Sequence, residues 1–360
     1  MESPPQPDKK IAYPIAHDET GGALYLYGSC DPSRKDKQKV VLCCPGWPDD
    51  HTVFMPLACR LAKEKDCFVG VICLPGFDDR PERPWRKHWK DGYTLEEMVA
   101  AVKEGAKALM AEVTSLTNRD IDYTAICHDW GVIVGMMQIN RAWEEAKDSP
   151  SKPHLSLIPN QIVLMDIGLP FHPKDQGKPQ LRPVLRPDKT MTLHEACVDT
   201  AYRVILATMF LLQRYVSGYL AVLTFVIGSG FLRLTRTSPS TVIDDKTIQD
   251  RNPNPLQLAY TSYPYYKVGR DLVTGNAHML DQHATLPILD HTDILFMYGT
   301  EKRSMFHDKR MVEYLNDFSS KGGQSCAVQI DGGGHWFFVQ QPEKSFQEIC
   351  KFMERENRRQ

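Results

Sequence analysis

Short, continuous runs of apolar residues recur along the chain and alternate with longer helical patterns. Residues 39–44 read KVVLCC, residues 67–73 read CFVGVIC and residues 161–167 read QIVLMDI. Runs that are apolar throughout, rather than at every second position, are typical of parallel strands covered on both faces. We expect three further strands at 123–127, 293–298 and 326–330. The pattern predicts an α/β protein with a mostly parallel sheet and helices on both faces.

Helical patterns fill the intervals between these runs. Thr94 precedes a long helical pattern whose first turn carries Glu96 and Glu97, and a hydroxyl cap followed by acidic residues is typical of a helix N-terminus. We expect further helices near 52–64, over 131–146, around 308–316 and after Pro342.

The rhythm changes between about 170 and 285. This segment is mostly helical with polar and proline-rich joints, and the alternation of strands and helices resumes after it. We interpret it as a helical cap inserted into an α/β core. The predicted organisation is a first part of the core over 1–170, the cap over 171–285 and a second part of the core over 286–360.

Composition and charge exclude several classes of protein. Of 360 residues, 42% are hydrophobic and 24% charged, which is ordinary for a folded globular chain. The net charge of −2 leaves no basic surface for nucleic acid. No Cys-x-x-Cys pair occurs among ten cysteines, and the first residues lack the apolar run of a secretion signal. We expect reduced, buried thiols in a cytoplasmic protein.

One uncharged stretch, 215–232, lies between Arg214 and Arg233. Its length touches the lower limit of about 18 residues for a membrane-spanning helix. Serine, threonine and glycine residues interrupt it, however, so we favour a buried or lid helix. Contact of 215–232 with a membrane surface or a lipid-like substrate is the alternative. The oligomeric state stays open.

The most informative motif is CHDWGVIVG at 127–135, where a predicted strand runs into a turn and then a helix. Small residues two positions on either side of Asp129 fit a nucleophile elbow, whose tight turn exposes the central side chain at the edge of the sheet. The central residue is aspartate rather than serine, which disfavours a serine esterase. We take His128 as structural, because neighbours on a strand face opposite sides.

Two other motifs have positions that fit this elbow. Residues 331–336 read DGGGHW and place His335 on a glycine-rich loop after the last predicted strand, where it can reach the elbow as a base. Residues 45–48 read PGWP after the first predicted strand. A backbone N–H of that turn, with the N–H of Trp130, would hold an oxyanion.

The elbow, the PGWP turn and the GHW motif, in this order, resemble the α/β-hydrolase superfamily. More narrowly, they resemble its epoxide hydrolase and haloalkane or haloacid dehalogenase branch. The similarity covers about 35–170 and 285–355. It implies an α/β-hydrolase fold with a cap, and no cofactor. The chain departs from the family pattern at Pro45, where the family has histidine.

The resemblance also implies a mechanism. Asp129 would attack an electrophilic carbon to form an ester, and His335 would activate water to hydrolyse it. The resemblance assigns the oxyanion N–H groups to Trp47 and Trp130.

A histidine base needs a carboxylate to orient it, and two candidates stay open. Lys302 occupies the family's usual position for the acid, beside Glu301. Asp166 ends an apolar strand, where an unpaired charge would be costly. We favour Asp166 over Glu301.

The leaving group is also open. In epoxide hydrolases two cap tyrosines donate a proton, and Tyr202 and Tyr266 best match them. Haloalkane dehalogenases hold halide with the tryptophan that follows the nucleophile, to which Trp130 corresponds, and with either a cap tryptophan or an asparagine. The cap segment has no tryptophan, and the asparagine position holds Trp47, whose indole N–H could substitute. We favour epoxide hydrolysis, with dehalogenation as the alternative.

The uncharged stretch favours a small apolar, lipid-derived substrate. A ligand-binding protein without turnover is an alternative of another class, since fold does not fix function. No metal is predicted, because His278, His283 and His291 lack matched ligand spacing.

Overall fold

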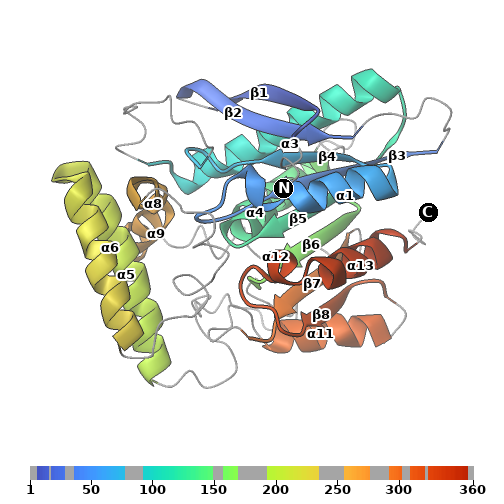
Figure 1. The fold of residues 1–360 in the computed structure, drawn as a ribbon. Helices are drawn as coiled ribbons and strands as arrows, with labels where there is room; N and C mark the ends of the chain where they lie inside the picture. The colour runs from blue at the N-terminus through green and yellow to red at the C-terminus, as the bar shows by residue number, and fades with distance from the viewer. Residues whose placement is uncertain are drawn as a thin grey trace.

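The computed structural model describes residues 6–15, 18–28, 36–77, 92–148, 157–168, 193–234, 255–275, 292–301, 309–320 and 323–355. A single sheet runs through the molecule, and a group of helices stands to one side of it (Figure 1).

The sheet has eight strands among the described residues. In chain order they are β1 (Lys9–Ile15), β2 (Asp18–Tyr27), β3 (Gln38–Cys44), β4 (Phe68–Ile72), β5 (Ile121–His128), β6 (Gln161–Met165), β7 (Asp293–Gly299) and β8 (Cys326–Ile330). Their order across the sheet is β1-β2-β4-β3-β5-β6-β7-β8. The β1–β2 and β2–β4 pairs are antiparallel and the others are parallel. The predicted mostly parallel sheet is confirmed.

The β1–β2 hairpin is absent from the strands that the sequence predicts. β1 is an edge strand, and most of its residues are exposed or half-buried, with only Tyr13 and Ile15 buried. β1 therefore has no continuous apolar run, and the pattern that identifies the central strands does not apply to it. Residues 23–27 of β2 read ALYLY and are buried, so they are such a run, which the prediction missed.

Helices connect and cover the parallel strands. They are α1 (Met55–Lys65), α3 (Leu95–Thr117), α4 (Trp130–Asp148), α11 (Lys309–Ser320), α12 (Phe337–Gln340) and α13 (Pro342–Met353). Helix α1 contacts α13, and α3 contacts α4. The predicted start of α3 is confirmed. Thr94 Oγ1 accepts from the N–H of Glu97 at 3.2 Å, and the Glu97 carboxylate accepts from the N–H of Thr94 at 2.6 Å.

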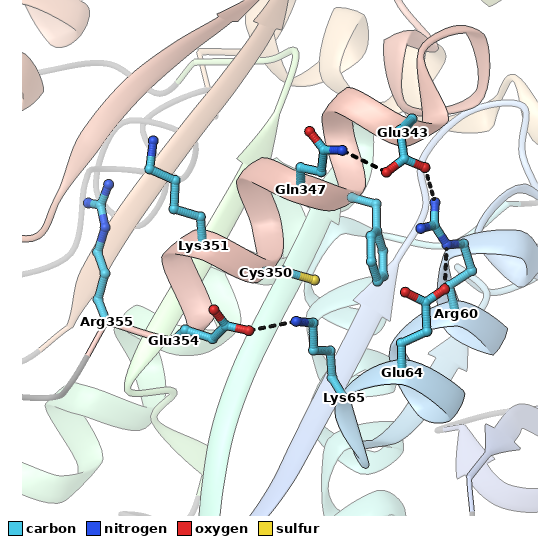
Figure 2. Close-up of a pocket in the computed structure, with 10 residues that line it drawn as sticks. Arg60, Glu64, Lys65, Glu343, Gln347, Cys350, Lys351, Glu354 and Arg355 are labelled. Carbon is cyan, nitrogen blue, oxygen red and sulfur yellow. Dashed lines mark hydrogen bonds and ion pairs between the residues drawn. The ribbon is translucent and has the colours of Figure 1, made fainter.

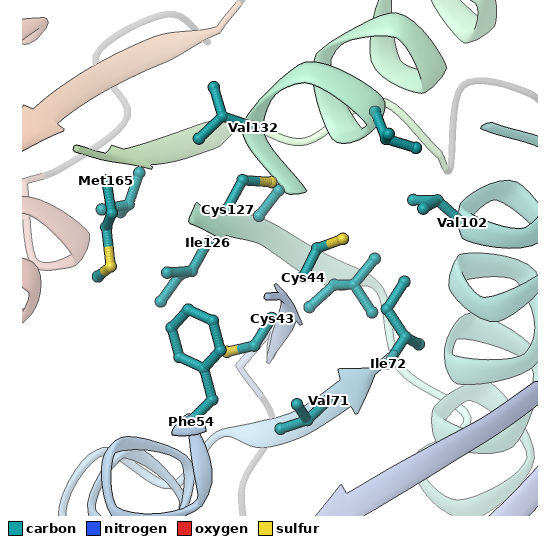
Figure 3. Packing of buried hydrophobic residues seen from close by; sticks show 14 of the residues in the cluster. Cys43, Cys44, Phe54, Val71, Ile72, Val102, Ile126, Cys127, Val132 and Met165 are labelled. Carbon is teal, nitrogen blue, oxygen red and sulfur yellow. The ribbon is translucent and has the colours of Figure 1, made fainter. Parts of the chain in front are cut away.

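The core lies between the sheet and these helices. Figure 3 shows Cys43, Cys44 and Cys127 packed among apolar side chains from neighbouring strands and helices. These thiols are free, and burial raises the pKa of Cys127 to about 12. A buried thiol that stays protonated packs as a small apolar group, as the sequence predicts.

Between β6 and β7 the described chain forms helices only. They are α5 (Leu193–Tyr215), α6 (Gly218–Leu234), α8 (Pro255–Thr261) and α9 (Tyr263–Val273), called the cap helices below. They contact one another and stand beside the sheet (Figure 1). The predicted cap boundaries at 170/171 and 285/286 lie outside the described residues.

Helix α6 carries most of the uncharged stretch. Its side chains Tyr219, Leu220, Leu223, Val226 and Ile227 are exposed. No helix in the described part of the chain is long and apolar enough to cross a membrane.

Candidate active site

Asp129 lies at a strained turn between β5 and α4. Its φ of 51° is left-handed, a region that residues other than glycine seldom adopt. The turn is tight because α4 begins at the next residue. A Cβ on Gly131 would lie 2.1 Å from the carbonyl oxygen of Cys44, so only glycine fits there. The strand, turn and helix of the predicted elbow are therefore present.

The carboxylate of Asp129 meets two backbone N–H groups. The N–H of Trp47 donates to Oδ2 at 2.8 Å, and the N–H of Trp130 also bonds to the carboxylate. The PGWP turn comes this close because residue 46 is glycine, where a Cβ would lie 2.6 Å from Oδ2. Trp47 and Trp130 thus lie where the predicted oxyanion hole requires them, although residue 45 is proline.

His335 lies between two carboxylates. Its Nδ1 is hydrogen-bonded to Oδ2 of Asp166, and its Nε2 is 3.8 Å from Oδ1 of Asp129. Asp166 is fully buried directly after β6. Glu301, the other candidate, has an exposed side chain, and its backbone N–H donates to the carbonyl of Gly333 at 3.0 Å. Of the two predicted partners, Asp166 is the one at the histidine.

Burial and hydrogen bonding act in opposite directions on Asp129. Burial raises the pKa of its carboxyl, while His335 and the N–H groups of Trp130 and Trp47 lower it, and the net shift is upward. The N–H donors and the imidazole favour the charged form that a nucleophile needs.

Two cap tyrosines face this site, and one of them differs from the prediction. Tyr202 on α5 and Tyr265 on α9 have ring centroids 6.1 Å apart, and Tyr265 lies 5.4 Å from Trp130. Trp130 forms a side-chain hydrogen bond to Tyr265, and the ring of Tyr202 packs edge to face against that of Tyr265. Burial, and then the charge of Asp129, raise the pKa of Tyr265 above its ordinary value.

Tyr266, the predicted partner of Tyr202, stacks instead on Phe210 with centroids 5.3 Å apart. Successive residues of an α-helix point about 100° apart, so a shift of one residue turns the side chain to another face. The adjacent Tyr265 replaces Tyr266 as the candidate. The pair Tyr265-Tyr266 is visible in the sequence, but the rotation of α9 that selects between them is not.

Helix α9 is held over the site by Tyr263. Its hydroxyl donates to the carbonyl of Pro75 at 2.9 Å, in the loop after β4. Its ring packs against Phe77 and Tyr93 of the core, with centroids 5.8 and 5.6 Å away. This anchor, two residues before Tyr265, fixes the helix relative to Asp129.

His128, Asp166 and His335 form a group that could be considered for metal binding, because one possible ligand atom from each lies within 4.8 Å of the others. His128 Nε2 is 3.0 Å from the backbone oxygen of His335. A ring nitrogen facing a carbonyl carries the proton and has no lone pair for an ion. We therefore interpret the group as a hydrogen-bond network. The three histidines considered for metal binding, His278, His283 and His291, lie outside the described residues.

A groove of about 420 Å³ lies on the surface between α1 and α13 (Figure 2). Ion pairs cross it, with Arg60 3.0 Å from Glu343 and Lys65 2.6 Å from Glu354. None of its lining residues belongs to the elbow, and Asp166 and His335 are not among them. Exposed pairs of this kind join the two helices only weakly.

Comparison with solved structures places this geometry in context. The haloalkane dehalogenase DatA from Agrobacterium tumefaciens matches over 97% of both chains, with a TM-score of 0.54 and 15% identity. An epoxide hydrolase from Vigna radiata matches over 96% of this chain and 97% of its own, with a TM-score of 0.52 and 14% identity. The Cif epoxide hydrolase from Acinetobacter nosocomialis covers 96% and 89%, at 0.50 and 13%.

The chain has the α/β-hydrolase fold. Identity this low establishes the fold and leaves the activity to the site itself. No family model matches the chain. A search of curated proteins also found no match. Within this α/β-hydrolase fold, Asp129, His335 and Asp166 come from the ends of β5, β8 and β6, so one edge of the sheet brings the three together.

Proposed function

We propose that the protein hydrolyses epoxides to vicinal diols through an ester on Asp129. The observation that carries the proposal is the pairing of a carboxylate held by two N–H groups with two cap tyrosines beside it. A carboxylate can open the ring, and a tyrosine can protonate the oxygen that departs.

In the first step, Oδ1 of Asp129 attacks a ring carbon, because Oδ2 is occupied by the N–H of Trp47. The carbon–oxygen bond of the ring breaks, and the oxygen takes the proton of Tyr265. The hydroxyl of Tyr265 is suited to this because its oxygen accepts from the indole N–H of Trp130, which leaves its own proton for the substrate. Its raised pKa keeps that proton in place at neutral pH.

In the second step, water adds to the carbonyl carbon of the ester. Nε2 of His335 takes a proton from this water, and Asp166 stabilises the imidazolium that forms. Negative charge develops on Oδ2, to which Trp47 already donates, and the N–H of Trp130 supports the same carboxylate. Collapse of the intermediate breaks the bond between Cγ and Oδ1, so the diol leaves with Oδ1 and takes the proton that remained on the added water, whose oxygen replaces Oδ1 in the carboxylate. The imidazolium proton returns to Tyr265.

Dehalogenation is the second candidate, and one observation favours it. The indole nitrogen of Trp47 is buried and has no hydrogen-bond partner among the described residues. Its ring lies 5.5 Å from that of Tyr265. An N–H donor in this position would suit a departing halide. The tyrosine pair favours the epoxide, because release of halide requires no proton.

The substrate class is part of the proposal. Rings of Trp47, Tyr202 and Tyr265 meet edge to face beside the carboxylate, which favours a small apolar or lipid-derived substrate. We also propose that the exposed apolar side chains of α6 contact a membrane surface from which such a substrate could be drawn.

A panel of epoxides and organohalides, assayed for diol and for free halide, tests the proposal. Diol without halide release is expected, and the variant Asp129→Asn should form no diol. Halide release would select the second candidate. A panel that yields neither product, with ligands that bind wild type and Asp129→Asn equally, would replace both with a binding protein.

A further inference from the structure

A second buried polar network lies behind His335, and the mechanism above leaves it without a role. Asp49 is 4% exposed, and its Oδ2 accepts from the indole N–H of Trp336 at 2.7 Å. The same oxygen is 3.8 Å from Nδ1 of His128. His128 is fully buried, and its Nε2 is 3.0 Å from the backbone oxygen of His335.

Burying a carboxylate and an imidazole together is costly unless their bonds are well made. Aromatic rings surround these groups. The ring centroid of His128 is 4.9 Å from that of Phe338 and 4.6 Å from that of His335. Apolar residues would fill this space at a lower cost in desolvation. The arrangement therefore indicates a requirement that packing alone does not explain.

The contacts of the network identify that requirement. Trp336 follows His335 directly, so the network holds the His335 loop at two adjacent points, a carbonyl and an indole. The loop begins with Gly332, Gly333 and Gly334, which leave the backbone free to adopt several conformations. Asp49 itself lies two residues after Trp47, which donates to Asp129. The network thus links the PGWP turn to the loop that carries His335.

We propose that Asp49 and His128 are positioning residues that fix the imidazole of His335 for activation of water. The inference rests on the proposed function, because it concerns the second step of that reaction. Asp49 acts through the indole of Trp336, and His128 acts through the backbone carbonyl of His335. The first step needs no base, so the network should matter mainly after the ester has formed.

The variant Asp49→Leu tests this by rapid-quench kinetics with an epoxide that wild type turns over. Hydrolysis of the ester should slow by about tenfold to a hundredfold, while its formation changes by less than about threefold. Asp49→Asn, which keeps an oxygen to accept from Trp336, should restore most of the rate. Trp336→Phe, which removes the indole donor and keeps an aromatic ring, should slow the same step.

Asp50→Ala is the matched control. Asp50 accepts from Thr52 in the same loop, and its loss should leave both steps unchanged. Equal slowing of both steps in Asp49→Leu and Trp336→Phe, or no slowing in either, would overturn the inference.

A spectroscopic measurement separates the inference from the proposed function. The proton of the His335–Asp166 hydrogen bond should give a far-downfield proton NMR signal in the protein without substrate. Asp49→Leu and Trp336→Phe should shift or broaden that signal, and Asp50→Ala should not. An unchanged signal would contradict the inference. A shifted signal in a protein that opens no epoxide would support the positioning role and refute the proposed function.

Discussion

The elbow and the cap contribute to one site by different means. The elbow side chain is fixed by the backbone, through a strand register, a left-handed residue and a glycine that permits close approach. The cap side chains are fixed by the rotation of two helices and by the anchor at Tyr263. A motif therefore locates a residue in the elbow, whereas in the cap a difference of one position selects another side chain.

The largest expected effect tests the assignment of Asp166, which lies at the sheet edge together with the elbow. Asp166→Asn keeps the shape of the side chain but favours the wrong tautomer of His335, and kcat should fall by about 10⁴-fold. Glu301→Gln, at the exposed alternative position, should leave kcat unchanged. Steady-state kinetics of the two variants on one epoxide decide between the two carboxylates. A loss of activity in Glu301→Gln alone would reverse the assignment.

The cap side is tested by three matched variants. Tyr265→Phe removes the proton donor beside Asp129, so formation of the ester should slow by about 10²-fold to 10⁴-fold. Tyr202→Phe should have a smaller effect, since phenylalanine keeps the ring that packs against Tyr265. Tyr266→Phe should leave the rate unchanged, because its ring stacks on Phe210. Single-turnover rates that fall in Tyr266→Phe and not in Tyr265→Phe would refute the choice between them.

Much of the core can be predicted from the sequence, because its backbone follows local patterns. Continuous apolar runs mark β3 to β8, and the motifs around Asp129 and His335 predict a nucleophile and a base at one sheet edge. The cost of an unpaired charge at a buried strand end favours Asp166 over Glu301, but the sequence alone leaves both candidates open.

The remaining features depend on tertiary contacts that local patterns do not encode. The contact of Asp49 with Trp336 joins residues 287 positions apart. The only local sign of it is an aspartate directly after the PGWP turn. His128, taken as structural from strand alternation, proves to contact the backbone of His335. The rotation of α9, which selects Tyr265, is set by a hydroxyl that bonds to a distant loop.

A smaller effect concerns the stability of the elbow. The folded state raises the pKa of Asp129, so it binds more protons than the unfolded state between the two pKa values. Stability contributed by this group therefore falls as pH rises through that interval, and the full cost is present at neutral pH. Asp129→Asn removes the buried charge, so it should raise the melting temperature above that of the wild type at neutral pH. Below the ordinary pKa of the carboxyl the wild-type side chain is also neutral, and the difference in melting temperature should disappear. Calorimetry that finds a lower melting temperature at neutral pH would contradict this account.

The smallest effect concerns the outer surface of the cap. Replacing exposed Leu223 and Ile227 with serine should weaken sedimentation with anionic lipid vesicles, because apolar area available for burial is lost. Leu116→Ser is the control, since Leu116 is exposed on α3 outside the cap. Equal sedimentation of the wild type, the α6 double variant and the control would reject membrane contact through α6.

The central claim is that Asp129 carries the ester, and trapping that ester tests it most directly. His335→Gln should form the intermediate and fail to hydrolyse it, because no base activates water. After incubation with an epoxide, the mass of the protein should increase by that of the whole epoxide, and the increase should map to the peptide that contains Asp129. The double variant Asp129→Asn with His335→Gln should gain no mass. An adduct on any other residue would contradict the account.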